Sequence, residues 1–556
     1  MKTPDKAAIM SHITAFGPDF PFAYDDWLTH PAGLGRIPAQ AHGKRVAIIG
    51  AGAAGITAGY ELMRLGLQPI IYESGRFGGR LRSEVFEGSD GVIAELGGMR
   101  FPISSRAFYH YVAATGSETA PFPNPLTSAA GSTVIDLEGE TLFARTKDDL
   151  PPLYADVAAA YASALEEGAQ FSALQDAIRA RDSAAVKALW NPLVAAWDER
   201  TFYDFVTTSS AFSALDFRHR EVFGQVGFGT GGWDSDFPNS MLEILRVNLT
   251  ELDDNQFYIK GGVENVLHRL WRTPANCAHW GADMTLERLN SGATRSRAVG
   301  IARSGTGFAV TDQWGNRDAY DAVLVTCQSH LLTTSIQVDE DIFSQKLWMA
   351  LDRTRYMQAA KTFVMVDRPF WHDINPTTGQ PLLSMTLTDR ITRGTYFFDN
   401  GPDQPAVICL SYAWMTDALK VLPIGAEARV KLALDALAKI YPGVDIASHI
   451  RGNPVCVSWE ADENFLGAFK GALPGHYRYN CRMFGHFMQA DMPPAQRGIF
   501  MAGDGVSFTP AWVEGAVQTA LNAVWGIMTH FGGQSAPENP GPGDLYPQLG
   551  PVTLPD

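Results

Sequence analysis

The stretch that decides the fold reads KRVAIIGAGAAG and spans residues 44–55. Its apolar part, 46–49, has the length and composition of a buried strand. A tight turn follows directly, made by Gly50, Gly52 and Gly55. An amphipathic helix is expected next, over 56–65, and its N-terminus would face the pyrophosphate of a dinucleotide. The segment therefore predicts a Rossmann-like strand–turn–helix unit.

The acidic residue that such a unit requires stands at a suitable distance. A second apolar run, 69–72, predicts the neighbouring parallel strand, and Glu73 follows it, 23 positions after Gly50 (73 − 50). A carboxylate at this place accepts hydrogen bonds from a ribose diol. A glycine motif alone can be an ordinary turn, but here strand, turn, helix, second strand and acid occur in the required order. We therefore expect a bound dinucleotide.

Bulk composition bounds the class of protein. With 556 residues, the chain is long enough for roughly two to four domains. Its formal net charge of −16 argues against nucleic acid or an anionic membrane as a partner. The absence of long apolar runs and of an N-terminal signal core leads us to expect a cytoplasmic protein. The five cysteines are widely spaced without a CxxC pair, which predicts free thiols and no metal site.

The pattern changes along the chain define the expected domains of this α/β protein. Turn formers and aromatic residues dominate 1–40, which we expect to wrap the surface as an ordered arm. An alanine-rich stretch with helical spacing, 151–224, predicts an inserted helical domain. The stretch 533–556, rich in proline and glycine, predicts a tail without a regular element. The dinucleotide-binding domain is expected to comprise 41–110, 255–335 and 490–532, and a second domain with an antiparallel sheet 111–150, 225–254 and 336–489.

Further motifs narrow the cofactor. They are GGR at 78–80, ELGGMRFP at 95–102, GD at 503–504 and WVEGA at 512–516. Paired glycines let the backbone approach a phosphate or a ring closely, and an arginine beside them can neutralise pyrophosphate charge. Nicotinamide-dependent folds do not generally require these additions, so the motifs favour a different dinucleotide.

Together these motifs resemble the flavin-dependent amine oxidase family, over about residues 44–530. Within it the chain looks most like the bacterial L-amino acid oxidases and monooxygenases, above all the L-lysine 2-monooxygenases. The segments that carry this closer resemblance are 16–35, 223–244, 344–358 and 466–480. The resemblance implies a Rossmann-like FAD-binding domain, an antiparallel-sheet substrate domain, an inserted helical domain and a homodimer.

The resemblance also implies FAD as the cofactor. Asp504 has independent support, because it lies between a strand end and a helix N-terminus, where polar ligand groups converge. Trp512 could instead be an ordinary core aromatic residue. The residues implied to contact FAD are Gly50, Gly52, Ala54, Gly55, Glu73, Gly79, Arg80, Met99, Arg100, Asp504, Trp512 and Val513.

Arg100 is the residue that points to an amino acid as the substrate. A guanidinium matches a carboxylate in bidentate fashion, and an ordinary amine has no carboxylate to bind. A surface salt bridge is the plain alternative. By resemblance, Tyr412 is a second carboxylate contact, Trp459 forms an aromatic wall beside the α-amine, and Lys361 holds a water against flavin N5. A lysine inside an apolar strand pattern is costly unless it has a partner or a task.

The far end of the substrate is assigned to two further residues by resemblance. Asp236, in a glycine-rich loop, would bind a side-chain ammonium, and Trp414 would offer a cation–π face. A loop aspartate often caps the next helix instead, a task that Asn239 or Ser240 could share. Leu252 stands where the lysine monooxygenases have a cysteine, which leaves the balance between oxygenation and oxidation open.

These residues predict FAD-dependent oxidation of a basic L-amino acid by O2, with L-lysine as the first choice and Lys361 and Trp459 as catalytic residues. Oxygenation would yield 5-aminopentanamide, carbon dioxide and water, whereas oxidase activity would yield the 2-oxo acid, ammonia and hydrogen peroxide. The alternatives are an oxidase of lysine, arginine or ornithine, a non-catalytic FAD-binding redox sensor, and a nicotinamide dehydrogenase. The last does not explain the motifs at 503–516.

Overall fold

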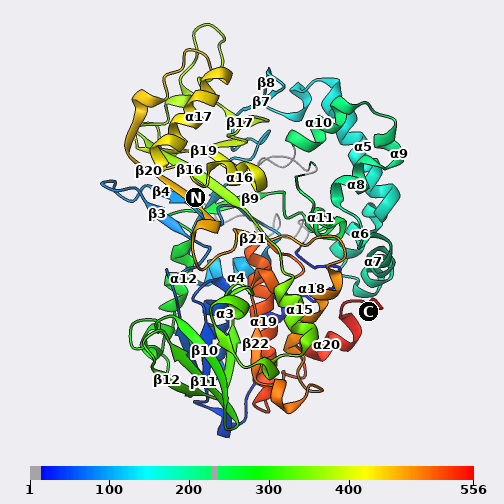
Figure 1. Cartoon of the computed structure of the whole chain (residues 1–556), viewed down its shortest axis with the longest axis vertical. Helices are drawn as coiled ribbons and strands as arrows, with labels where there is room; N and C mark the ends of the chain where they lie inside the picture. The colour runs from blue at the N-terminus through cyan, green and yellow to red at the C-terminus, as the bar shows by residue number, and fades with distance from the viewer. Residues whose placement is uncertain (1–13, 227–233, 235, 556) are drawn as a thin grey trace.

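The predicted α/β class is confirmed by a computed structural model, which describes residues 14–226, 234 and 236–555. Figure 1 shows two lobes built on sheets, one above the other, with a group of helices along one side. None of the helices in these ranges is long and apolar enough to cross a membrane.

The sheet predicted from the opening motif contains parallel strands in the order β2-β1-β13-β22. Strands β1 (Arg45–Ile49) and β2 (Gln68–Tyr72) agree with the predicted runs to within one residue. Strands β13 (Ala322–Val325) and β22 (Ile499–Met501) come from distant parts of the chain. Their pairing brings the motifs near residues 50 and 503 to the same sheet edge, where ligands bind in open parallel sheets.

Two helices begin at that edge and pack against each other. Helix α3 (Ala53–Arg64) starts three residues earlier than predicted, directly after the glycine turn. Helix α19 (Val513–His530) is buried on almost every side and contacts α3 along its length. Because both helices direct their N-termini to the sheet edge, their unpaired N–H groups and dipoles favour an anionic ligand there.

The upper lobe in Figure 1 contains a seven-stranded sheet in the order β20-β16-β19-β18-β17-β7-β8. Strand β16 (Ala359–Val366), the second from one edge, is buried throughout, because strands pair on both of its sides and helix α17 (Ala426–Ile440) packs against it. Except for the parallel β17–β7 pair, the strands run antiparallel, as predicted. The other strands are β7 (Thr133–Leu137), β8 (Glu140–Ala144), β17 (Met385–Thr388), β18 (Gly394–Phe398), β19 (Ala406–Trp414) and β20 (Ile450–Ser458).

The helices on one side of Figure 1 come from the alanine-rich stretch and its continuation. Helices α5 (Pro152–Ala169), α6 (Phe171–Arg179) and α7 (Ser183–Trp197) lie where helical spacing predicted them. They continue into α8 (Phe202–Thr207), α9 (Ser210–Ser213), α10 (Phe217–Val226) and α11 (Met241–Leu249).

Smaller elements complete the two lobes. Strands β10 (Ala298–Ser304), β11 (Gly307–Asp312), β12 (Arg317–Tyr320) and β14 (Gln337–Val338) form a second sheet beside the nucleotide sheet. Strands β3 (Ser83–Val85) and β4 (Ile93–Glu95) form a hairpin, and β5 (Phe101–Pro102), β9 (Gln256–Ile259) and β6 (Thr119–Pro121) a three-stranded sheet. Other elements are β15 (Tyr356–Met357), β21 (Phe469–Lys470), α2 (Tyr24–Thr29), α4 (Arg106–Ala114), α12 (Glu264–Trp271), α15 (Gln345–Asp352), α16 (Met415–Val421) and α18 (Tyr477–Phe484).

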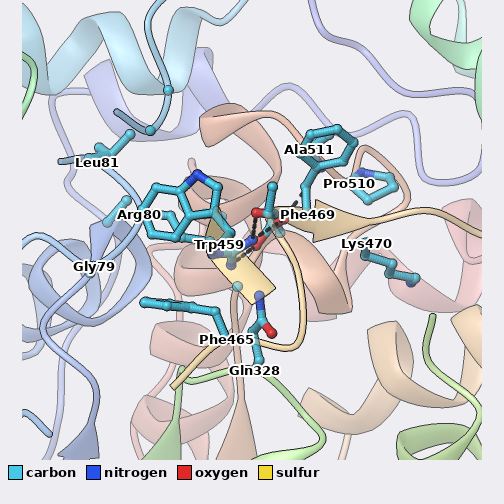
Figure 2. Close-up of a pocket in the computed structure, with 18 of the residues that line it drawn as sticks. Gly79, Arg80, Leu81, Gln328, Trp459, Phe465, Phe469, Lys470, Pro510 and Ala511 are labelled. Carbon is cyan, nitrogen blue, oxygen red and sulfur yellow. Dashed lines mark hydrogen bonds and ion pairs between the residues drawn. The ribbon is translucent and has the colours of Figure 1, made fainter. Parts of the chain in front are cut away.

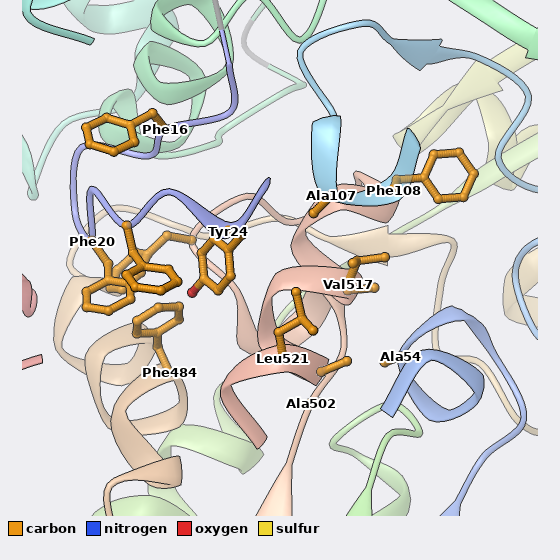
Figure 3. Close-up of a cluster of buried hydrophobic side chains, with 14 of the residues drawn as sticks. Phe16, Phe20, Tyr24, Ala54, Ala107, Phe108, Phe484, Ala502, Val517 and Leu521 are labelled. Atoms are coloured by element: carbon orange, nitrogen blue, oxygen red, sulfur yellow. The ribbon is translucent and has the colours of Figure 1, made fainter. Parts of the chain in front are cut away.

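The N-terminal arm is part of the core and does not wrap the surface as predicted. Phe16, Phe20 and Tyr24 are buried together with residues of α18 and α19, as Figure 3 shows. The ring of Phe20 lies edge-on to that of Phe484, with centroids 5.6 Å apart. Aromatic residues dominate the arm because each removes a large apolar area from water. Residues 1–13 lie outside the described part of the chain.

The prediction of a tail without regular structure is wrong, because helix α20 (Pro542–Leu549) lies in it. Pro542 occupies the first helical turn, where a missing N–H group costs nothing. The Asp544 carboxylate accepts hydrogen bonds from the Gly541 backbone N–H and from the indole N–H of Trp525 in α19. A tertiary contact thus stabilises a helix that the local sequence does not predict.

Candidate active site

The glycine turn leaves no room for side chains. A Cβ atom added at Gly55 would lie 2.0 Å from the carbonyl oxygen of Gly50, and one added at Gly50 would lie 2.7 Å from Thr326 Oγ1. Gly50 also has a φ of +118°, which side chains strongly disfavour. The turn therefore presents bare backbone at the start of α3, where a pyrophosphate can approach closely.

A cavity of about 340 Å³ extends from this turn to the seven-stranded sheet. Residues from both lobes line it, and Figure 2 shows the part around Arg80, Trp459 and Phe469. The predicted site residues that line it are Gly50, Gly52, Ala54, Glu73, Gly79, Arg80, Met99, Arg100, Lys361, Tyr412, Trp414, Trp459, Asp504, Trp512 and Val513. Gly55 lies behind the lining, and its role is the close packing against Gly50.

Glu73 stands at the end of β2 beside the turn. Its two carboxylate oxygens accept hydrogen bonds from the backbone N–H groups of Ala51, at 2.7 Å, and Gly75, at 2.8 Å. Burial nevertheless raises the pKa of this carboxyl above its ordinary value. Because the turn itself anchors the side chain, the carboxylate faces the cavity in a fixed orientation, as a ribose contact requires.

Arg80 and Asp504 join the first and last motifs of the chain. The guanidinium donates to both carboxylate oxygens of Asp504 and to the carbonyl oxygen of Ala468, which lies 3.0 Å away. Figure 2 labels Arg80, and its dashed lines mark hydrogen bonds and ion pairs in this part of the cavity. The two predicted cofactor contacts therefore form one unit, in which each side chain orients the other.

Lys361 lies in the middle of β16, opposite Tyr412 of β19. Its ammonium donates to the carbonyl oxygens of Glu95, at 3.1 Å, and Gly97, at 2.5 Å. It also lies 4.7 Å from the centre of the Tyr412 ring. Burial lowers the pKa of Lys361 to about 8. The two carbonyl oxygens are the partners that make a lysine tolerable in an apolar strand. With a pKa near 8, the lysine can change its charge near neutral pH.

Arg100 follows β4 and faces the cavity beside Tyr412. Its guanidinium carbon lies 5.9 Å from the centre of the Phe122 ring, and Nη1 lies 3.5 Å from the Tyr396 hydroxyl. Among the residues that the structure describes, no carboxylate forms an ion pair with it. The surface salt bridge considered as an alternative is therefore not observed, and the guanidinium remains available to an anionic ligand.

Two aromatic side chains shield this part of the cavity. Trp459 is almost fully buried and meets the Phe465 ring edge-on, with centroids 5.1 Å apart. Trp414 meets Tyr412 in the same way, at 5.7 Å. Rigid aromatic walls of this kind exclude water and strengthen electrostatic contacts inside a site.

Asp236 is exposed and is not among the described residues that line the cavity, so its role as the ammonium site stays a prediction. Both of its carboxylate oxygens are used by Thr416, whose backbone N–H lies at 3.1 Å and whose hydroxyl lies at 2.8 Å. Thr416 belongs to the first turn of α16, so Asp236 satisfies a helix N-terminus. The helix-capping alternative fits this geometry, although the helix is not the next one in sequence.

The charged residues of the lining that the sequence interpretation missed are Glu243, Asp253, Arg297 and Lys470. Glu243 accepts hydrogen bonds from Asn239 Nδ2 and the Ala472 backbone N–H, both at 2.6 Å. Burial lowers the pKa of the Lys470 ammonium to about 8. The only sequence signal for Asp253 was its place in an acidic pair after Leu252.

Leu252 itself is fully buried and lies behind the cavity wall. It packs in a small cluster with Ala15 and Val247, against which Trp512 rests. Val247 and Trp512 both line the cavity. The residue that departs from the family pattern can therefore act only through the position of its neighbours.

Together, the parallel sheet, the bare glycine turn, the fixed Glu73 carboxylate and the Arg80–Asp504 pair define a dinucleotide-binding oxidoreductase. The long cavity continues beyond the dinucleotide turn to a lysine and an unpaired arginine, which suits a cofactor with a reactive ring at its far end. The chain belongs to the family described as flavin containing amine oxidoreductases, whose model matches residues 53–528. FAD is accordingly its cofactor.

Similar proteins agree with this assignment. Tryptophan 2-monooxygenase from Pseudomonas savastanoi is 30% identical, with 91% of this chain and 93% of that one covered. The enzyme of the same name from Pantoea agglomerans pv. gypsophilae is 28% identical, with 90% and 91% covered. These relatives do not bear the lysine name that the sequence resemblance led us to expect.

Solved structures share the fold at lower identity. Putrescine oxidase bound to putrescine has a TM-score of 0.64 and 17% identity, with 87% of this chain and 99% of that chain covered. Cyclohexylamine oxidase from Brevibacterium oxydans IH-35A has a TM-score of 0.65 and 16% identity, with 88% and 100% covered. At these identities the likeness is evidence of the fold alone.

Proposed function

We propose that the protein oxidises a basic L-amino acid, with L-lysine as the substrate, using FAD and O2. The observation that carries the amino acid assignment is the unpaired guanidinium of Arg100, which faces the cavity beside Tyr412. The α-carboxylate would receive two parallel hydrogen bonds from Arg100 and one from the Tyr412 hydroxyl. An amine without a carboxylate would leave this arginine buried and unpaired, which is costly.

The chain's own residues orient the reacting carbon. The chemistry that FAD supplies when bound is two-electron oxidation of the Cα–N bond and transfer of those electrons to O2. With the carboxylate held by Arg100, the α-amine would face Trp459, and Cα would lie toward Lys361. Lys361 is held by two backbone carbonyls and has its pKa near 8, so it can place a water or release a proton at this face. Trp459 and Trp414 keep bulk water out.

The relatives named tryptophan 2-monooxygenase supply a second candidate, oxidation of an aromatic L-amino acid. Both candidates share the carboxylate clamp and differ at the far end of the cavity. A cationic side chain is favoured here because a carboxylate, Asp253, lines that cavity. Whether the products leave as amide and carbon dioxide or as 2-oxo acid and hydrogen peroxide depends on the geometry around Trp512, behind which Leu252 packs.

The test is anaerobic mixing of the FAD-loaded protein with a panel of L-amino acids, while the absorbance of oxidised flavin is followed. L-lysine should remove this absorbance fastest, and D-lysine should not. Mass spectrometry of aerobic reactions, with hydrogen peroxide measured in parallel, then gives the product ratio. If tryptophan is faster than lysine, the basic substrate is excluded. If no amino acid reduces the flavin, the whole assignment fails.

A further inference from the structure

The cavity contains a carboxylate for which no task has been assigned. Asp253 lies in the turn between α11 and β9 and lines the same cavity as Arg100, Tyr412 and Trp414. Its side chain is half-buried, and the accessible part belongs to the cavity wall. Its neighbour in sequence, Asp254, is exposed and does not belong to the wall.

Asp253 differs from the other carboxylates of the cavity in its lack of donors. Glu73 is held by two backbone N–H groups, Glu243 by Asn239 and a backbone N–H group, and Asp504 by Arg80. No described residue donates a hydrogen bond to Asp253 or forms an ion pair with it. A carboxylate shielded from bulk water is costly unless a cation or donors satisfy it. Apart from the nearby charge of Arg100, a cationic group of a ligand in the cavity would supply such a partner.

Asp253 lies within electrostatic range of Arg100, the residue assigned to the substrate carboxylate. The groups whose charge acts on it are Arg100 and Asp254, and it acts in turn on Tyr161 of helix α5. The pKa of Lys361, at the reacting face, responds to the charges of Cys409, Glu95 and Arg100. Arg100 thus acts electrostatically on both groups. A ligand whose carboxylate is bound at Arg100 and whose Cα faces Lys361 has its other end free to reach Asp253.

We propose that Asp253 is the specificity-determining residue that binds the side-chain ammonium of the substrate, in place of Asp236. This inference rests on the proposed function, since it needs an amino acid bound at Arg100. The two fixed charges then match a substrate with an anionic and a cationic end. An indole or an aliphatic side chain would leave Asp253 without a partner, and this selects against such substrates.

The test compares L-lysine with L-norleucine, which has the same chain length but no ammonium. In the FAD-loaded wild type, kcat/KM should favour lysine. In Asp253→Asn, kcat/KM for lysine should fall on the order of 100-fold, through KM, while the value for norleucine stays within about threefold. Asp254→Asn is the matched control, because it removes the adjacent charge outside the cavity. At a pH well above 7, where Asp253 is ionised in both proteins, it should leave the lysine-to-norleucine ratio unchanged.

The pH dependence of the lysine-to-norleucine ratio of kcat/KM gives an independent readout. Burial raises the pKa of Asp253 to about 7, although the positive charge of Arg100 opposes the shift. In the wild type the preference for lysine should therefore decline as the pH falls through about 7, because the carboxylate becomes neutral. The α-amine and α-carboxylate are common to both substrates and cancel in the ratio. In Asp253→Asn the ratio should be low and independent of pH.

Several outcomes would overturn the inference. They are equal losses for both substrates in Asp253→Asn, an unchanged ratio in that variant, or a collapse of the ratio in Asp236→Asn alone. A wild type that prefers norleucine or tryptophan would also overturn it, even though amino acid oxidation would stand. Failure of the proposed function is distinct, since then no amino acid reduces the flavin. If Asp253→Asn does not retain FAD, Asp253→Ser serves as the second variant.

Discussion

Arg100 is the single residue on which the choice of an amino acid rests, and its removal gives a direct test. Arg100→Ala should raise KM for L-lysine on the order of 100-fold, because two charge-assisted hydrogen bonds to the carboxylate are lost. The inhibition constant of 1,5-diaminopentane, which is lysine without its carboxylate, should not rise. Arg100→Lys keeps the charge but loses the bidentate geometry, so its KM for L-lysine should lie between those of the wild type and Arg100→Ala. An unchanged KM for lysine in Arg100→Ala would remove the clamp from the mechanism.

Because Lys361 is buried, it should make the free energy of unfolding depend on pH. Its pKa falls from an ordinary value of 10.5 to about 8 in the folded protein. Between these values the unfolded chain binds more protons than the folded one, so the lysine makes folding more favourable as the pH rises from 8 to 10.5. Lys361→Met removes this contribution. The Tm of the wild type should therefore rise relative to that of Lys361→Met across this range.

The control for this prediction is Lys431→Met, because Lys431 is an exposed lysine of α17. Its Tm should run parallel to that of the wild type over the same pH range. Parallel curves for Lys361→Met as well would contradict a lowered pKa at Lys361.

Residues next to a strand end or within a regular strand could be placed from the sequence. Asp504 follows β22, and Lys361 lies in an unbroken apolar strand, so the backbone alone fixes where they lie. Loop carboxylates could not be placed in this way. Asp236 turns to Thr416, which is 180 positions away, while Asp253 faces the cavity only because α11 and β9 come together around it. The direction of such a side chain depends on tertiary contacts that no local pattern encodes.

At the scale of elements, the junction of β1 with α3 should be intolerant of a single methyl group. In Gly55→Ala the new Cβ would lie 2.0 Å from the Gly50 carbonyl oxygen, so the turn must open. We expect the purified variant to lose most of its FAD, measured as the flavin-to-protein ratio. Gly425→Ala is the matched control, because that glycine has a φ of −68° and no atom lies within 4 Å of the added Cβ. A full complement of FAD in Gly55→Ala would show that the turn does not hold the pyrophosphate.

Elements with strong periodicity agreed with prediction, whereas those made by tertiary contacts did not. Strand β1 carries its own hydrophobic pattern and appears within one residue of the predicted limits, and helix α7 lies inside the stretch where helical spacing predicted helices. Helix α20 has a weak local preference because of its prolines and glycines. It forms because glycines let its backbone approach the Trp525 indole closely and because Asp544 bonds that indole.

At the scale of the whole molecule, a buried ion pair fixes the N-terminal arm to the helices on one side of the molecule. Asp19 accepts hydrogen bonds from the Arg246 guanidinium of α11 and, at 3.0 Å, from the indole N–H of Trp190 in α7. Both charged side chains are almost completely buried. The sequence suggested an ordered arm but not its burial, because the partners lie 171 and 227 positions away.

Asp19→Ala should therefore destabilise the protein strongly. Removal of the carboxylate leaves the Arg246 charge buried without its partner, which costs about 3–5 kcal/mol in such pairs. Asp435→Ala breaks the exposed Lys431–Asp435 pair of α17 and should cost less than about 1 kcal/mol. Denaturant unfolding of the FAD-loaded variants, followed by flavin release and by tryptophan fluorescence, measures both effects. Since the arm lies beside α19 and behind Trp512, Asp19→Ala should release flavin together with the fluorescence change, at a lower denaturant concentration than the wild type. A loss of stability no larger than that of Asp435→Ala would mean that the arm is not an integral part of the folded unit.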